Sequence, residues 1–303
     1  MTDALIVLIL TSISCSLLGI FLILRKLSMM TDAISHSVLL GIVLAFFLVR
    51  DLDSPLLIIG ASLMGLVTVF LIESIGKLKL AKLDDATAIV YPLLFSIAVI
   101  LISKFFRNVH LDTDIVMMGE VIFSSMIRTQ IFGIEVSKSI LEAALSLICV
   151  IAFIGIFYRK LKIGSFDEEF ASLVGISTGL IFYSLMTITS FVAVTSFNNV
   201  GAIIVISFFI GPAAIALLFA RSLREAFLLA TLASLINPSL GFFLAIRLNV
   251  SITGMIATIN MASYLALIII KKYILDRSIN YGKNQSSKRG LSNNNIQIDA
   301  GKR

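Results

Sequence analysis

Long apolar runs follow one another along almost the whole chain, with short clusters of charged residues between them. They fall at about residues 4–24, 29–49, 55–75, 85–103, 139–158, 174–196, 200–220, 225–246 and 252–271. Each run is close to the ~20 residues that a helix needs to cross a hydrocarbon core of about 30 Å. The runs are too long for barrel strands and lack their alternation of lumen and lipid faces. The pattern therefore predicts an all-α fold, a polytopic bundle of eight or nine transmembrane helices within residues 1–277.

Composition agrees with a lipid environment. The 303 residues are 58% hydrophobic and 14% charged, whereas soluble domains are about 25% charged. Residues 278–303 differ, because they are rich in Asn, Ser, Lys and Gly. Such a segment buries too little apolar surface to offset the entropy of ordering, so we expect a disordered tail there.

The distribution of lysine and arginine predicts the orientation. With the amino terminus outside, the inner connections and the end of the last span hold thirteen of these residues before position 280, and the outer connections hold six. Because basic residues favour the cytoplasmic side, we expect the amino end outside and the tail in the cytoplasm. Anionic inner-leaflet lipid then accounts for the basic excess, and nucleic acid is not an expected partner. The outer connection 104–138 contains an apolar stretch, Ile115 to Ile127, that is too short to span and is expected to be re-entrant or interfacial.

A carboxylate and an imidazole interrupt the second apolar run. Asp32 and His36 are four residues apart and therefore share one face of a helix. An aspartate at the centre of a bilayer costs on the order of 2.5 to 3.5 kcal/mol, so it is expected to face a polar path or a partner. One oxygen and one nitrogen ligand suit zinc, manganese or iron better than magnesium or calcium. The alternative from spacing alone is a buried pair that orients two helices.

The chain lacks the motifs of an enzyme. No G-x-x-x-x-G-K-[ST] loop occurs in the sequence, so any ATP hydrolysis is expected on another polypeptide. No nucleophile, base or H-E-x-x-H arrangement indicates catalysis, and no cofactor is expected.

The connection after the fifth apolar run contains an acidic cluster. Asp167, Glu168 and Glu169 are followed at once by Phe170 and Ala171. Acidic residues favour the first turn of a helix, so a short helix is expected. It is either a solvated connection or a docking helix for a cytoplasmic partner.

These segments together resemble the permease subunits of the zinc, manganese and iron ABC importers, the ABC-3 family. The resemblance runs from about residue 5 to 275. The segments that show the resemblance occur in the same order as in the family: 25–28 with 32–41, then 83–86, 118–120, 166–171 with Gly175, and 200–204 with 211–216.

The resemblance implies a type II-like importer permease in a bacterial cytoplasmic membrane. It implies a dimer, formed either by two copies of this chain or by this chain and a sister permease. It also implies two ATP-binding subunits on the cytoplasmic side and an extracytoplasmic metal-binding protein. In the family, an aspartate and a histidine of this block look like residues of the transport path, and Asp32 and His36 match them here. The resemblance implies that the divalent metal is the substrate. The acidic-Phe-Ala segment looks like the element that meets the ATPase, which transfers to 167–171. The family often has proline where this chain has Leu40 and Glu168.

Two other functions fit the residues alone. A secondary cation transporter would use Asp32 as a proton carrier, although no internal repeat is evident in the sequence. A noncatalytic membrane scaffold would need neither Asp32 nor His36.

Overall fold

The computed structural model describes residues 2–51, 54–78, 82–105, 128–131 and 134–273. Its labelled elements are α1 (Thr2–Leu24), α2 (Ser28–Val49), α3 (Pro55–Lys77), α4 (Leu83–Phe105), β1 (Arg128–Ile131), β2 (Ile134–Ser137), α7 (Lys138–Phe166), α8 (Glu168–Leu173), α9 (Thr178–Val200), α10 (Ala202–Phe219) and α11 (Leu223–Leu248). A last helix covers Ile252–Tyr273. Contacts divide the chain into one unit at 1–261 and a second at 262–303.

Nine helices in the described part of the chain are long and apolar enough to cross a membrane. They fall where the apolar runs predicted spans, which confirms the all-α fold and a multi-pass membrane protein. Helices are favoured because lipid offers no hydrogen-bond partner to an exposed backbone group. The predicted tail at 278–303 and the expected helix at Ile115 to Ile127 lie outside the described residues.

Two details differ from the sequence prediction. Helix α7 continues to Phe166, beyond the apolar run that ends near 158, so much of the expected connection is helical. Strands β1 and β2 pair as a short antiparallel sheet, with Arg128 opposite Ser137. A helix does not have to end where its apolar stretch ends, and strands of four residues carry too little pattern to be recognised.

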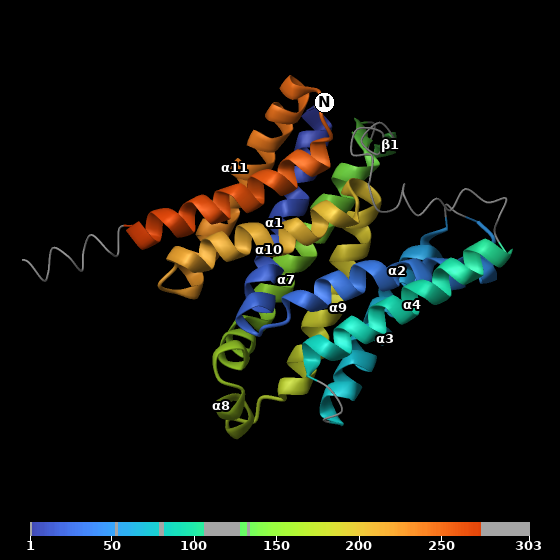
Figure 1. Ribbon diagram of the computed structural model, residues 1–303, viewed down its shortest axis with the longest axis horizontal. Coiled ribbons are helices and arrows are strands. Elements are labelled where there is room, and N and C mark those ends of the chain that lie inside the picture. The colour runs from blue at the N-terminus through green and yellow to red at the C-terminus, as the bar shows by residue number, and fades with distance from the viewer. Residues whose placement is uncertain (1, 52–53, 79–81, 106–127, 132–133, 274–303) are drawn as a thin grey trace, which may run out of the picture. The chain divides into compact units, whose positions relative to one another are not determined.

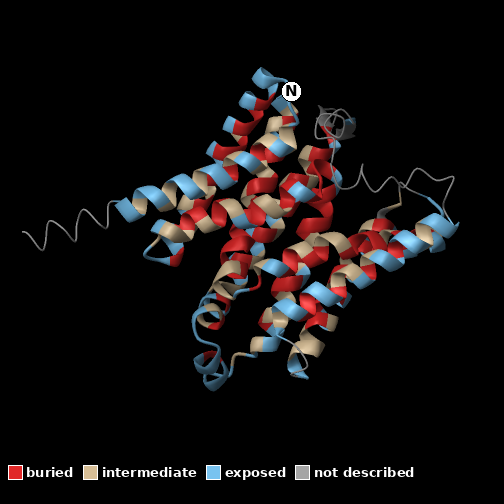
Figure 2. Cartoon of the chain, viewed as in Figure 1, coloured by how far each residue is buried: buried red, intermediate tan, exposed pale blue. Residues whose placement is uncertain are grey.

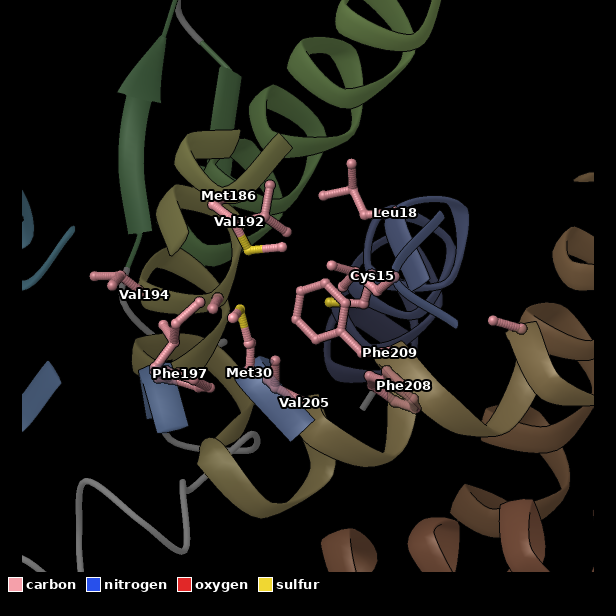
Figure 3. Packing of buried hydrophobic residues seen from close by; sticks show 14 of the residues in the cluster. Cys15, Leu18, Met30, Met186, Val192, Val194, Phe197, Val205, Phe208 and Phe209 are labelled. Atoms are coloured by element: carbon pink, nitrogen blue, oxygen red, sulfur yellow. The ribbon is translucent and has the colours of Figure 1, made fainter. Parts of the chain in front are cut away.

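Helix α1 lies at the centre of the first unit. It packs against α7, α9, α10 and α11, while α2 packs against α3 and α4 (Figure 1). Burial is greatest in α1, α9, α2 and α10, whereas α4, α7 and the last helix are largely exposed (Figure 2). Figure 3 shows the core where Cys15 and Leu18 of α1 approach Phe208 and Phe209 of α10.

Small residues allow close helix approach. Ser207 and Gly211, four residues apart, both face Asn260 of the last helix: Asn260 donates a hydrogen bond to Ser207 Oγ at 2.9 Å, and a Cβ on Gly211 would lie 3.0 Å from the Asn260 Cβ. Asn260 also accepts a hydrogen bond of 2.9 Å from Asn237 of α11. Ser207 and Gly211 thus form a small face that the last helix approaches closely, and polar bonds of this kind link helices in lipid.

Gly19 of α1 is required by its contact with α10. A Cβ on Gly19 would overlap the backbone oxygen of Phe209 and lie 3.2 Å from the Cβ of Ala213. Forcing extra atoms into a packed core costs about 1–3 kcal/mol. We therefore expect Gly19→Ala to lower the melting temperature of the purified protein in detergent. Gly155→Ala is the matched control, since a Cβ there meets nothing within 4 Å, and equal melting of the two variants would contradict the close α1–α10 contact.

Candidate metal pathway and docking helix

Helix α2 holds the two predicted metal ligands side by side. His36 Nε2 lies 3.5 Å from Asp32 Oδ1, as the spacing of four predicted. In the helical turn between them, the Ser35 hydroxyl donates a hydrogen bond of 2.8 Å to the backbone oxygen of Thr31. The carboxylate of Asp32 and the imidazole of His36 thus lie next to each other on one face of α2.

Two aromatic side chains of α4 hold the imidazole. Tyr91 stacks on His36 with ring centroids 5.4 Å apart and an interplanar angle of 24°. Phe95, one turn further on, meets the same ring edge-on at 5.8 Å. These contacts fix the plane of the ring and leave its nitrogens to the carboxylate and to any ligand. The sequence did not identify Tyr91 or Phe95, because two aromatics in an apolar run look like ordinary core residues.

The pair is accessible and does not by itself complete a coordination shell. The side chain of Asp32 is 35% exposed and that of His36 is 26% exposed. Within the described residues no three His, Cys, Asp or Glu side chains gather closely enough to hold a metal ion. A divalent ion at this pair would therefore take its other ligands from water, from backbone oxygens or from another chain, an arrangement suited to weak binding and release.

The predicted short helix is α8, and its ends are well defined. Asp167 caps the amino end, since its carboxylate accepts a hydrogen bond of 2.8 Å from the Phe170 backbone N–H. Gly175, with φ of +78°, adopts the left-handed conformation just beyond the carboxyl end. The acidic start that predicted the helix therefore includes the residue that caps it, whereas the role of Gly175 was not predicted.

Helix α8 presents apolar side chains to its surroundings. Ala171 is fully buried and anchors the helix, whereas Phe170 and Leu173 of α8 and Phe166 at the end of α7 are exposed. Exposed apolar side chains gathered at one place mark interaction surfaces. Glu169 is also exposed, and Glu168 pairs with Arg25, a contact that the sequence did not predict.

Other predicted blocks have simpler placements. Asp84 and Asp85 form the first turn of α4, where acidic side chains favour the helix dipole. Leu40 lies buried within α2, and the helix runs unbroken through the position where proline is frequent in the resembling family. The block 118–120 lies outside the described residues.

Comparison with known proteins identifies the family. The family model described as "ABC 3 transport family" matches residues 1–271. The chain is 38% identical over 256 residues to the zinc transport system membrane protein TroD of Treponema pallidum, covering 84% of this chain and 70% of that one. It is 38% identical over 257 residues to the manganese transport system membrane protein MntD of Bacillus subtilis, covering 84% and 87%. The solved structure of PsaBC from Streptococcus pneumoniae in complex with Fab has a TM-score of 0.73 and 29% identity, covering 88% of this chain and 90% of that one. The chain belongs to the ABC 3 transport family.

Proposed function

We propose that this protein is the membrane-spanning permease subunit of an ATP-driven importer for a divalent transition metal, with zinc and manganese as the first candidates and iron as the third. The observation that carries the proposal is the partly exposed Asp32–His36 pair on a spanning helix of a chain in this family. Relatives named as zinc and manganese transport proteins support the choice of metal.

In this proposal the metal is the substrate and passes the pair in transit. Asp32 offers a carboxylate oxygen, and His36 offers a nitrogen lone pair when its imidazole is neutral. Borderline divalent ions accept both ligand types. An incomplete ligand set keeps the ion from resting there, because conduction needs binding that is weak enough to allow exit.

The energy would come from a separate ATP-binding subunit that docks on α8. Closure of two such subunits would move α8 and change which side of the membrane reaches the Asp32–His36 pair. A second copy of this chain or a sister permease would face the same path, and an extracytoplasmic metal-binding protein would deliver the ion. The exposed apolar side chains of α8 support this assignment.

The proposed orientation places α8 in a bacterial cytoplasm. Its contact with Arg25 puts α8 beside the connection 25–27, and both belong to the set of connections rich in Lys and Arg. We expect a membrane-impermeant maleimide to label Ser251→Cys and to spare Ser172→Cys in intact cells. Both serines are exposed, and the substitutions would be made in a chain whose Cys15 and Cys149 are alanine. Labelling of Ser172→Cys alone would reverse the orientation.

Uptake by the complex reconstituted in proteoliposomes tests the function. Zinc, manganese and ferrous iron would be supplied in competition, with ATP and the cognate ATP-binding subunit present or omitted. We expect accumulation that needs both ATP and the subunit. Accumulation driven by a proton gradient without them would instead identify a secondary transporter, and the absence of accumulation under every condition would indicate a scaffold.

A further inference from the structure

The connection between α1 and α2 forms a rigid corner. Lys26 has φ of +58°, and the N–H groups of Lys26 and Leu27 donate hydrogen bonds of 3.0 and 2.7 Å to Ile23 and Leu22. This pattern closes the carboxyl end of α1 in a Schellman motif, and α2 begins at once with Ser28. The backbone at Arg25 is therefore tied closely to the start of α2.

Arg25 reaches from this corner into contacts with two other elements. Its side chain is only 4% exposed, and its Nη2 donates to Glu168 Oε1 of α8 at 2.5 Å. Its guanidinium carbon lies 6.0 Å from the centroid of the Phe182 ring on α9. The corner thus contacts the docking helix and the helix that follows it.

Glu168 is the acceptor that compensates this buried charge. Nη1 of Arg25 is buried and has no hydrogen-bond partner in the described part of the chain. A buried cation that loses its anionic partner becomes strongly unfavourable, whereas Glu168 itself is largely exposed and is solvated more easily. A displacement of α8 that carried Glu168 away would therefore draw Arg25 with it or force the corner to rearrange.

We propose that Arg25 and Glu168 are positioning residues that transmit movement of the docking helix α8 to α2, and so to the Asp32–His36 pair. Asp32 lies seven residues beyond Arg25 and four beyond Ser28, the first residue of α2, which is about one helical turn. This inference rests on the proposed function, because it assigns to α8 the movement imposed by the ATP-binding subunit.

A double-mutant cycle in the whole complex tests whether the contact between Arg25 and Glu168 couples ATP hydrolysis to metal transport. Arg25→Gln, Glu168→Gln and the double variant would be coexpressed with the ATP-binding subunit and the metal-binding protein. Metal uptake, ATP hydrolysis, copurification and melting temperature would be measured for each. We expect each single variant to keep the ATP-binding subunit and to lower the metal moved per ATP hydrolysed on the order of ten-fold. The double variant should be no worse than either single one, because both remove the same contact.

Two further variants separate the link from charge and from folding. Lys26→Gln removes a neighbouring exposed cation at the same corner and should leave the ratio of metal to ATP unchanged. Arg25→Lys keeps the charge and loses the planar fork, so it should restore part of the coupling. An unchanged ratio in Arg25→Gln, losses that multiply in the double variant, or a loss matched by an equal loss of folded protein would each overturn the proposal.

Failure of the link is distinguishable from failure of the docking assignment. If the Phe170→Asp variant of α8 still binds the ATP-binding subunit, α8 is not the docking element, and the proposed source of movement is wrong. If Phe170→Asp releases the subunit while the Arg25→Gln variant transports normally, α8 remains the docking element. Only the proposed coupling through Arg25 and Glu168 is then excluded.

Discussion

Phe170→Asp is expected to release the ATP-binding subunit from the permease. Phe170 is 52% exposed in the isolated chain and lies on α8 next to the buried Ala171. Aromatic side chains at the centre of an interface contribute about 2 kcal/mol or more, equivalent to about 30-fold in affinity. A carboxylate buried in the same place would add the penalty of an unpaired charge. Copurification from detergent and the dissociation constant of the subunit would measure the loss.

The matched control for this prediction is Phe170→Leu, which keeps an apolar side chain at the same place on α8. It should retain most of the binding, and both variants should melt at the temperature of the parent protein because Phe170 is not part of the core. If Phe170→Asp copurified with a fully transport-coupled subunit, α8 would not be the docking element.

The transmembrane helices could be predicted from the sequence because a long apolar run that crosses lipid has to be helical. Every spanning segment must satisfy its own backbone hydrogen bonds, so the prediction 29–49 became Ser28–Val49 and 200–220 became Ala202–Phe219. Helix ends in water are less constrained. For that reason α7 continues through its basic residues to Phe166.

The candidate site was only partly predictable. Asp32 and His36 are close in sequence, and helix geometry alone brings their side chains together. Tyr91 could not be assigned to His36 from the sequence, because the two residues meet only through the packing of α2 against α4. Likewise Arg25 and Glu168 are 143 positions apart, and no local pattern pairs them.

Because His36 of α2 stacks on Tyr91 of α4, a substitution at His36 can distinguish a metal ligand from a packing residue. His36→Phe would keep an aromatic ring against Tyr91 and Phe95 and remove both nitrogens. A packing role predicts that this variant transports nearly as well as the parent protein. A ligand role predicts near loss of uptake, because no other side chain of the pair supplies nitrogen.

Asp32→Asn and His36→Gln complete this test, since each keeps polarity and approximate size. Loss of a residue that merely supports a metal ligand costs about 10- to 100-fold in metal affinity or activity, so removal of a ligand itself should lower uptake at least on the order of 100-fold. Uptake of zinc and manganese by the assembled transporter would be measured beside copurification of the ATP-binding subunit and melting temperature, both expected to be unchanged. Ser35→Ala is the control on the same helix, because that hydroxyl is bonded to the backbone of its own turn. Normal uptake by Asp32→Asn, His36→Gln and His36→Phe would exclude the pair from the metal path and leave it the structural role of holding α2 against α4.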